Sequence, residues 1–201
     1  MLFRSDLSAA FDTVDTELLL YRLRKFFGIQ GAPLGWISSF LSDRTQQVVY
    51  RTSMSASKEL NCGVPQGSVL GPLLFSLYMT ELSDIVSRHG LDVHFYADDT
   101  QLYTSVPALD TNIAVSKFTE AMVDIEQWLN SSRLKLNADK TQYIWVGTRQ
   151  QLSKVDISHI DMLGTSIQAS TTVKDLGVLL DGCLTMTDHI RSMSKSSFFQ
   201  L

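Results

Sequence analysis

The sequence predicts an α+β protein built on a mostly antiparallel sheet with helices on one face. Short stretches of alternating polar and apolar residues are separated by hairpin-length turns. Longer stretches with apolar residues at helical spacing interrupt them at irregular intervals. The chain has 201 residues, of which 44% are hydrophobic and 19% charged. It is therefore long and apolar enough to bury one sizeable core.

The N-terminal part of the chain is expected to contain a strand, two helices and a strand pair. Residues 1–7 are typical of a strand. Apolar residues at helical spacing from Val14 onward predict a helix that ends at Gly28, with acids near its start. Pro33 begins a second short helix. A strand pair follows, formed by residues 46–52 and 58–62 around a turn of Ser, Met and Ala residues.

The rest of the chain continues the mixture of helices and hairpins. Residues 63–68 form a loop, because two glycines and a proline fall within six positions. Residues 70–86 are apolar nearly all round, which predicts a deeply buried helix. Two short strands between Val93 and Tyr103 meet at Asp98-Asp99. The remaining expected elements are an amphipathic helix after a cap at Asp110, strands at 134–136 and 143–146 around a turn at 137–140, a strand pair at 173–180, and a last helix from Thr187 to Leu201.

Charge and cysteine content bound the function classes. The net charge is -4. Gripping phosphates needs Lys and Arg, so this balance disfavours a stand-alone nucleic-acid-binding module and suits an acidic core that binds metal. The two cysteines, Cys62 and Cys183, form no CxxC pair and no Cys/His cluster, which indicates neither zinc nor a disulfide framework.

No segment has the composition of a membrane or secretion signal. The longest apolar stretch is broken by Gly71 and Pro72 and falls far short of the roughly 20 residues that span a bilayer. The first residues lack the apolar core of a signal peptide. We therefore expect an intracellular protein, in the nucleus or the cytoplasm, with no membrane partner.

Two adjacent carboxylates stand where a folded protein would not favour them, in Tyr96-Ala-Asp-Asp99 between apolar strand residues. Like charges this close repel each other and lose hydration unless a cation lies between them. Magnesium prefers carboxylate oxygens, so a divalent metal is one solution. A solvated Asp-Asp turn accounts for the pair equally well on these residues alone. Asp6, at the end of the first strand, is by itself better explained as an ordinary strand-terminal acid.

The order of these segments along the chain closely resembles the motif series of reverse transcriptases from non-LTR, LINE-type retrotransposons. The segments that carry the resemblance are Asp6-Leu-Ser-Ala-Ala-Phe11, Gly63-Val-Pro-Gln-Gly-Ser-Val-Leu-Gly-Pro72, Tyr96-Ala-Asp-Asp99 and Leu134-Lys-Leu-Asn-Ala-Asp-Lys-Thr141. It extends to Arg44-Thr-Gln46 and to Val173-Lys-Asp-Leu-Gly-Val-Leu-Leu-Asp181, and so covers essentially the whole chain. The combination of the Tyr-Ala-Asp-Asp box with a Pro-Gln-Gly loop is highly specific.

The resemblance implies an RNA-directed DNA polymerase core with the fold of a right-hand polymerase palm. It places the palm at residues 1–183 and the start of a helical thumb at 184–201. Two Mg²⁺ ions, for which Mn²⁺ can substitute, would be held by Asp6, Asp98 and Asp99. One ion would activate the primer 3′-hydroxyl and the other would hold the triphosphate, so that both oxygens of an in-line displacement are stabilised. The implied partners are an RNA template with a DNA primer and deoxynucleoside triphosphates.

The resemblance also assigns roles outside the acids. Phe11 matches the gate that excludes a 2′-hydroxyl, although without the motif it is better explained as a core Phe. Gln66, with Gly67 beside it, matches the residue that contacts the incoming nucleotide. Lys140 matches a candidate proton donor to pyrophosphate, and a solvated turn lysine explains it at least as well. Leu176 and Gly177 match the segment that grips the primer end.

Departures from the family pattern are equally informative. The family has apolar residues immediately before the first catalytic Asp, whereas Arg4 and Ser5 stand there in this chain. The fingers region before Asp6, a complete thumb and an endonuclease domain are all expected in a family member and are expected to be missing here. We therefore expect weak or no primer extension by this chain alone. The alternatives are a catalytically inactive remnant that keeps the fold and, less compatible with Phe11 and the Pro-Gln-Gly loop, a two-metal nuclease.

Overall fold

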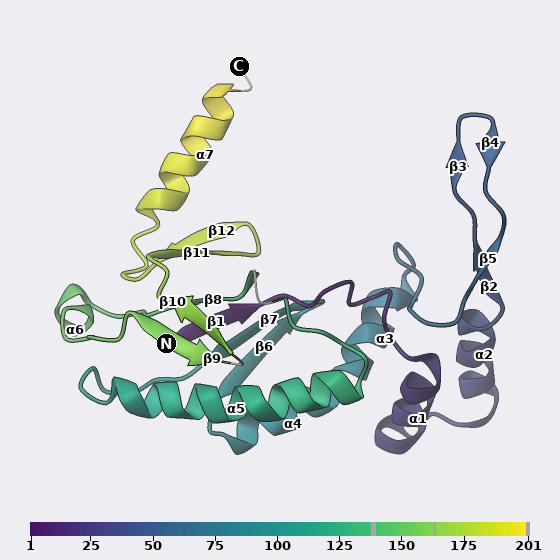
Figure 1. Ribbon diagram of the computed structural model, residues 1–201, viewed down its shortest axis with the longest axis horizontal. Helices are drawn as coiled ribbons and strands as arrows, with labels where there is room; N and C mark the ends of the chain where they lie inside the picture. Colours follow the sequence, from purple (N-terminus) through teal and green to yellow (C-terminus); the bar gives the residue numbers. More distant parts are fainter. Residues whose placement is uncertain (138–139, 163, 200–201) are drawn as a thin grey trace. The chain divides into compact units, whose positions relative to one another are not determined.

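The computed structural model describes residues 1–137, 140–162 and 164–199, and its helices and strands are shown in Figure 1. The chain divides into two compact units. Unit 1 consists of Met1–Asp6, Ser83–Glu126 and Leu136–Leu201. Unit 2 consists of Leu7–Leu82 and Gln127–Lys135.

The centre of unit 1 is a four-stranded antiparallel sheet in the order β6-β7-β1-β8. Its strands are β1 (Leu2–Ser5), β6 (Asp92–Tyr96), β7 (Asp99–Tyr103) and β8 (Gln142–Ile144). In register, Phe3 lies opposite Leu102 on β7 and opposite Tyr143 on β8. The first strand of the chain is therefore central in the sheet, with sequence-distant neighbours on both sides.

Helix α5 (Thr111–Ser131) covers one face of this sheet, and α4 (Thr80–Arg88) lies on the same side (Figure 1). The Phe3 ring lies 5.8 Å from that of Phe118 on α5, and both side chains are fully buried. The alternation along β1 explains this packing, because successive side chains point to opposite faces of a strand. The α+β class with an antiparallel sheet and helices on one face is confirmed.

The other elements of unit 1 are short hairpins and two helices. They are α6 (Arg149–Leu152), the hairpin of β9 (His159–Met162) with β10 (Thr165–Gln168), the hairpin of β11 (Thr172–Asp175) with β12 (Val178–Asp181), and α7 (Thr187–Phe199). The hairpin predicted at 173–180 and the helix predicted from Thr187 are confirmed. No strand forms at residues 134–136, contrary to the prediction, and Ala138 and Asp139 of the predicted turn lie outside the described residues.

Unit 2 contains α1 (Thr16–Phe27), α2 (Gly31–Leu41), α3 (Leu70–Tyr78) and a ribbon of four short strands. Asp15 caps α1 by accepting a hydrogen bond from the backbone N–H of Leu18 at 2.8 Å. Gly28 ends the helix at φ 65°, in the left-handed region that favours glycine. The start and end predicted for this helix are therefore confirmed. The second helix begins at Gly31, two positions before Pro33.

A buried arginine organises the core of unit 2. Arg22 is 4% exposed, and its guanidinium donates to the Tyr78 carbonyl at 2.9 Å and to the Ser132 hydroxyl at 2.8 Å. Its Nε also lies 2.8 Å from a carboxylate oxygen of Glu81. The guanidinium carbon lies 4.4 Å from the centre of the Tyr78 ring and 4.7 Å from that of Trp128. One side chain thus links α1, the α3–α4 junction and the end of α5.

Two predicted elements of unit 2 were wrong in detail. Residues 70–86 form two helices, α3 and α4, that meet at Met79. Hydroxyl groups disturb the helical ladder here, because Thr80 donates to the Ser76 carbonyl at 3.3 Å and Ser76 donates to the Pro72 carbonyl at 2.9 Å. The segment is also not buried all round, since Leu73 is 55% exposed.

The ribbon at residues 44–60 turns earlier than predicted. Its strands are β2 (Arg44–Gln46) with β5 (Lys58–Leu60) and, nearer the tip, β3 (Val49–Tyr50) with β4 (Ser53–Met54). The turn falls at Arg51 and Thr52, where Arg51 takes a positive φ of 53°. Of the residues that predicted the turn, Ser53 and Met54 form β4, and residues 55–57 interrupt the ladder between β4 and β5. The Ser55 hydroxyl accepts from the Val48 N–H at 2.9 Å between the two strand pairs.

Candidate active site

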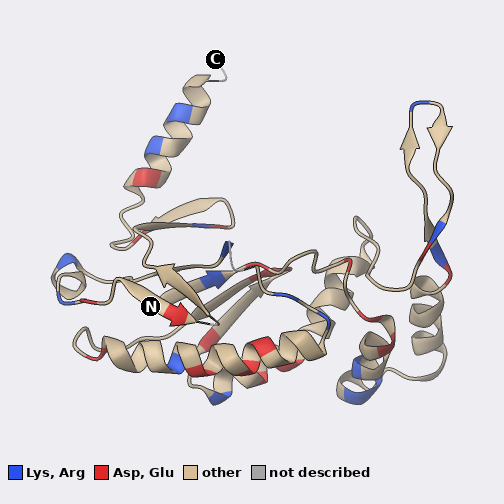
Figure 2. Cartoon of the chain, in the orientation of Figure 1, with Lys and Arg blue, Asp and Glu red and all other residues tan. Residues whose placement is uncertain are grey.

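The face of the sheet opposite α5 carries the polar side chains of β1. Phe3 and Ser5 are buried towards the helix side, so the alternating positions Arg4 and Asp6 belong to the other face. Ser5 pairs with Thr100 in register, so continuing the ladder by one residue places Asp6 opposite Asp99. Sequence periodicity and strand pairing therefore gather cations and acids on one face of unit 1. The charged residues of the chain are shown in Figure 2.

Asp98 lies in the tight turn between β6 and β7, whose last pair in register is Tyr96 with Asp99. The predicted hairpin at the two acids is confirmed, with arms that run from Asp92 to Tyr96 and from Asp99 to Tyr103. Ala97, the first turn residue, has a positive φ of 54°. A non-glycine residue in this region is uncommon, so the chain holds the Asp98 turn in a strained conformation.

The carboxyl groups of Asp6 and Asp98 meet, although 92 positions separate them in sequence. Burial is the main cause that raises the pKa of Asp98, partly offset by its own backbone N–H. The charge of Asp6, a hydrogen bond to its side chain and the charge of Asp99 raise the pKa further. Two crowded carboxylates mark a place where a cation would be stabilised.

Lys140 already supplies one positive charge to this pair. Its Nζ donates to Asp6 Oδ2 at 2.6 Å, which raises the pKa of the lysine. The fully exposed amine keeps its proton more firmly as a result. A general acid works best when its pKa is near the working pH, so this direction does not favour Lys140 as a proton donor while it pairs with Asp6.

Asp99 has a different partner. The Arg4 guanidinium donates to Asp99 Oδ1, and its Nε lies 3.8 Å from Asp175 Oδ1 at the end of β11. Gln101 donates to the same Asp175 oxygen at 2.7 Å. Sequence analysis identified Arg4 as a departure from the family pattern and missed its partners. The available signal was the spacing of two positions between Arg4 and Asp6, which places both on one face of the strand.

The donor set fits a magnesium ion that is completed by substrate. Among the described residues, no three His, Cys, Asp or Glu side chains are arranged to hold a metal by themselves. Asp6 and Asp98 provide two facing carboxylates, and Asp99 is turned to Arg4. Magnesium is commonly bound by one or two carboxylates together with substrate phosphates and water. Two carboxylates, one directly after β1 and one in the β6–β7 turn, therefore fit the ion.

The β11–β12 turn carries the two residues predicted to contact a primer. Leu176 and Gly177 both have positive φ, at 44° and 90°, as a type I′ hairpin turn requires at its two central positions. A leucine is poorly suited to this region, and its side chain is 46% exposed. The chain thus presents an apolar side chain on a strained turn.

Phe11, Gln66 and Gly67 belong to unit 2, where the Pro-Gln-Gly loop packs on the segment after Phe11. The Phe11 carbonyl accepts from the backbone N–H of Val64 at 2.8 Å, and Gln66 donates to Asp12 Oδ1 at 2.9 Å. The Phe11 ring stacks on that of Phe75 with centres 4.8 Å apart. Phe11 is half-buried, so its ring is neither fully in the core nor free.

Two glycines of this loop are dictated by its geometry. A Cβ at Gly63 would lie 2.9 Å from the Asp12 carbonyl oxygen, and Gly63 has a positive φ of 84°. Gly67 also has a positive φ, of 77°, with open space around it. The first glycine allows two backbone segments to approach closely, and the second leaves the loop backbone exposed beside Gln66.

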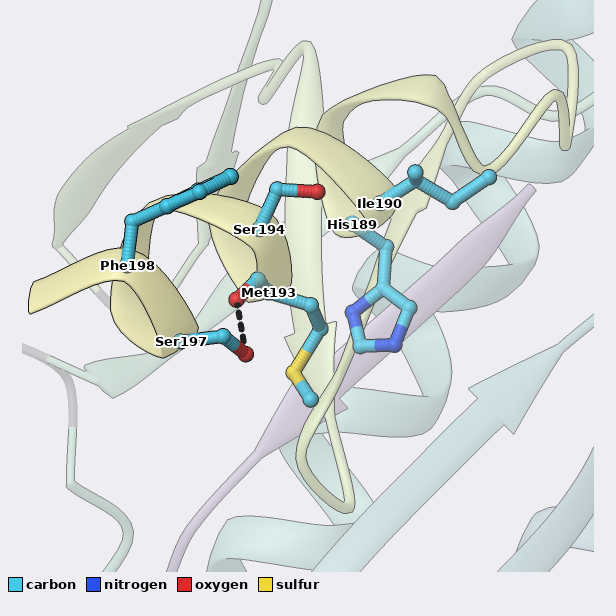
Figure 3. Close-up of a pocket in the computed structure, with 6 residues that line it drawn as sticks. All are labelled: His189, Ile190, Met193, Ser194, Ser197 and Phe198. Atoms are coloured by element: carbon cyan, nitrogen blue, oxygen red, sulfur yellow. Dashed lines mark hydrogen bonds between the residues drawn. The ribbon is translucent and has the colours of Figure 1, made fainter. Parts of the chain in front are cut away.

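Helix α7 carries a shallow pocket along one of its faces (Figure 3). The pocket is lined by His189, Ile190, Met193, Ser194, Ser197 and Phe198, all from this one helix. The lining holds no acid, so this pocket offers none of the chemistry of the carboxylate face.

Residues 1–180 match the family described as "Reverse transcriptase (RNA-dependent DNA polymerase)". The chain belongs to the reverse transcriptase family. It is 32% identical over 199 residues to "Probable RNA-directed DNA polymerase from transposon BS" of Drosophila melanogaster, and 29% identical over 196 residues to "RNA-directed DNA polymerase from mobile element jockey" of the same species. These matches confirm a reverse transcriptase domain of the non-LTR retrotransposon type.

The matches cover most of this chain and little of the relatives. They include 96% and 95% of this reverse transcriptase chain, but 21% and 20% of the two relatives. The chain therefore spans about a fifth of the length of the curated relatives it matches.

Solved telomerase structures share the fold of this reverse transcriptase domain. The apo telomerase from Candida tropicalis, truncated from its C-terminal domain, matches with a TM-score of 0.60 at 16% identity. The match covers 92% of this chain and 34% of the telomerase chain. The telomerase from Candida albicans, in a complex with a fragment of telomeric RNA, matches with a TM-score of 0.55 at 17% identity. This match covers 93% of this chain and 32% of the telomerase chain. This likeness supports the palm-like fold.

Within the described residues, no helix is both long and apolar enough to cross a bilayer.

Proposed function

We propose that this domain is the catalytic core of an RNA-directed DNA polymerase, which joins deoxynucleotides to the 3′-hydroxyl of a DNA primer on an RNA template. The observation that carries the proposal is the meeting of Asp6 and Asp98 on the face of the sheet opposite α5, beside Asp99. Family membership makes nucleotidyl transfer the reaction that such a carboxylate pair serves.

Asp6 and Asp98 are the proposed metal ligands, and Asp99 is the third acid of the site. Two Mg²⁺ ions, or Mn²⁺ in their place, would supply charge stabilisation for the attacking and leaving oxygens of an in-line displacement. The chain itself does the positioning. Its central strand fixes Asp6, the Ala97 turn fixes Asp98, and Lys140 holds Asp6 through an ionic hydrogen bond.

The nucleotide-binding roles of Phe11, Gln66 and Gly67 are part of the same proposal. The Gln66 side chain is exposed and tethered to Asp12, and the glycine beside it leaves room for a ligand. Phe11 is proposed as the group that disfavours a 2′-hydroxyl, and Leu176 with Gly177 as the contact to the primer end. Residues 1–183 are the proposed palm, and residues 184–201 the proposed start of a thumb.

Primer extension on a poly(rA)/oligo(dT) template with Mg²⁺ or Mn²⁺ tests the proposal. In a chain extended with the flanking segments of a relative, we expect extension that Asp6→Asn and Asp98→Asn each abolish, whereas the chain alone should extend weakly or not at all. The matched control is Asp161→Asn, which removes an exposed acid of β9 in the same unit and should leave extension unchanged. Extension that survives Asp98→Asn would remove the proposed site. Mn²⁺ binding without any extension, in this chain and in one extended with the flanking segments of a relative, would favour the inactive remnant.

The proposed gate has its own test. In an active form of the domain, Phe11→Ala should raise the incorporation of ribonucleotides relative to deoxynucleotides, because a smaller side chain leaves room for the 2′-hydroxyl. Since Phe11 also stacks on Phe75, Phe11→Leu serves as a control for lost packing. Single-nucleotide incorporation with matched rUTP and dTTP measures the ratio, and an unchanged ratio in Phe11→Ala would remove the gate role.

A further inference from the structure

We propose that Arg4 is a positioning residue, which connects the β11–β12 hairpin to the catalytic turn, the turn between β6 and β7 that holds Asp98. This connection, called the tie below, would hold the hairpin in a fixed place where it meets the primer end. The part that concerns the primer rests on the proposed function. The tie itself is a property of unit 1 and is argued from its contacts.

Arg4 lies between two hairpins and pairs with an acid of each. It donates to Asp99 at the start of β7, directly after the catalytic turn, and its Nε lies 3.8 Å from Asp175 at the end of β11. The side chains of Arg4, Asp99 and Asp175 are 19%, 22% and 17% exposed. Ion pairs shielded to this degree are weakened less by solvent than pairs on the open surface.

Gln101 reinforces the same connection. It lies opposite Arg4 in the β1–β7 register, so both side chains point to the same face of the sheet. Its amide donates to Asp175 Oδ1 at 2.7 Å. Asp175 therefore receives a cation from the central strand and a hydrogen bond from the neighbouring strand.

The β11–β12 hairpin is anchored to the sheet at its base by backbone hydrogen bonds. Ser170, just before β11, donates its N–H to the Tyr143 carbonyl at 2.8 Å, and Gly147 donates its N–H to the Gly182 carbonyl at 2.9 Å, just after β12. Both contacts lie at the end of the hairpin away from its turn. Arms of four residues extend about 13 Å at the rise of a strand, so anchors at the base alone leave the turn free to swing.

Asp175 supplies the anchor at the turn end. It is the last residue of β11, paired with Val178, and the exposed turn residue Leu176 follows it directly. Fixing Asp175 therefore fixes Leu176 and Gly177, the residues proposed to contact the primer. Arginine suits this task because its planar fork can serve two acids at once, whereas a lysine is a single point charge.

Amide hydrogen exchange of the 201-residue chain tests the tie. We expect Arg4→Gln and Asp175→Asn each to lower the protection of the β11–β12 amides about tenfold, equivalent to about 1.4 kcal/mol. The double variant should lower protection by less than the sum of the single effects, because both changes remove the contact of Arg4 with Asp175. The matched control is Lys174→Gln, which removes an exposed charge from the same hairpin and should leave protection unchanged.

Several outcomes would contradict the tie. Additive effects in the double variant, or unchanged protection in Asp175→Asn, would overturn it. Because Arg4 lies on the central strand, Arg4→Gln can also lower global stability. The Asp175→Asn variant avoids this difficulty, because Asp175 lies in the hairpin and not on the central strand. Arg4→Lys gives a second test of the contact at position 4, because it should keep at most one of the two ion pairs.

A primer–template with 2-aminopurine at the primer 3′ end separates positioning from simple support of the fold. We expect Arg4→Gln and Asp175→Asn to reduce the fluorescence change of the probe on binding, while fluorescence anisotropy shows that total affinity changes little. An unchanged probe signal beside a loosened hairpin would overturn the positioning role and leave an ion pair that only supports the fold. No binding of the probe, either by the unmodified chain or by one extended with the flanking segments of a relative, would refute the proposed function, whereas hydrogen exchange would still decide the tie.

Discussion

At the scale of single residues, the chain places charged side chains where they lower the stability of the fold. Only a bound ligand would offset this loss of stability. Asp6 and Asp98 face each other, and the causes that raise the pKa of Asp98 are burial and its acidic neighbours. Arg4 and Lys140 offset Asp99 and Asp6, whereas no ion pair within the described residues gives Asp98 such a cationic partner. Sites that bind metal commonly carry this kind of strain, and removing it stabilises the fold at the expense of function.

Asp98→Asn should therefore stabilise the metal-free domain at neutral pH, by up to about 1 kcal/mol, the magnitude of close charge pairs at partly exposed sites. A raised pKa means that the folded state holds the proton more tightly. The stabilisation this provides is present below 3.8, the ordinary value, and is lost as the pH rises through the raised pKa. The gain from Asp98→Asn should thus appear above the raised pKa and disappear as the pH falls below 3.8.

Urea denaturation between pH 3 and 8, followed by circular dichroism, measures this gain. Added Mn²⁺ should reverse the ranking at neutral pH, because an ion that binds only the folded state stabilises the unmodified domain and not the variant. Asp161→Asn is the control for loss of an exposed acid. A loss of stability in metal-free Asp98→Asn at pH 7 would show that Asp98 serves the fold.

Arg22 is the opposite case, a buried charge that has an acid and two hydrogen-bond acceptors beside it. Arg22→Ala should cost about 3 kcal/mol, because it leaves the Tyr78 carbonyl and the Ser132 hydroxyl without their donor and removes the partner of Glu81. The exposed Arg24 on the same helix gives the control Arg24→Ala, which should change stability by less than about 0.5 kcal/mol. Thermal and urea unfolding compare the two, and equal effects would mean that the buried network contributes nothing particular.

At the scale of elements, the sequence predicted best the helix ends and hairpins whose structure is decided by nearby residues. The α1 cap at Asp15 and stop at Gly28, the acid hairpin and the hairpin at 173–180 were all predictable, because caps, turns and periodicity are local signals. The apolar segment 70–86 was predicted as one buried helix, since hydrophobicity does not show that Leu73 is left exposed. The turn of the ribbon was misplaced because Arg51 adopts a left-handed conformation that its residue type does not suggest.

The turn of the β11–β12 hairpin shows an element whose stability and proposed function conflict. Leu176→Asn should stabilise this hairpin by about 1 kcal/mol, because Asn-Gly is the preferred pair for a type I′ turn and leucine is disfavoured at positive φ. The same change removes the exposed apolar side chain and should weaken binding of the primer end. Hydrogen exchange of residues 172–181 and binding of a labelled primer–template measure the two effects. A stabilised hairpin with unchanged primer binding would remove Leu176 from the primer contact.

At the scale of the whole molecule, charge is divided between the units. Unit 1 holds the acid site and carries nine Lys and Arg against fifteen Asp and Glu, whereas unit 2 carries eight against six. This asymmetry was visible in the sequence only once the chain had been divided, because the units interleave along it. The contact of Arg4 with Asp175 was hidden for a different reason, because the two residues are far apart in sequence and lie on strands of different sheets.

The excess of positive charge in unit 2 leads to the last prediction, which concerns salt. Binding of a primer–template should weaken as salt rises, with a logarithmic slope of about -0.7 to -0.9 per phosphate contacted. The ribbon of unit 2 exposes Arg51 and Lys58, and we expect their joint replacement by Gln to reduce the magnitude of this slope by up to about 2. The control pair is Arg149→Gln with Lys154→Gln, two exposed charges at or near α6 in the acidic unit, which should leave the slope unchanged. Fluorescence anisotropy titrations between 50 and 200 mM KCl, roughly the range in which such contacts are most sensitive, measure both slopes. Equal slopes in the two double variants would mean that Arg51 and Lys58 of the ribbon do not contact phosphates.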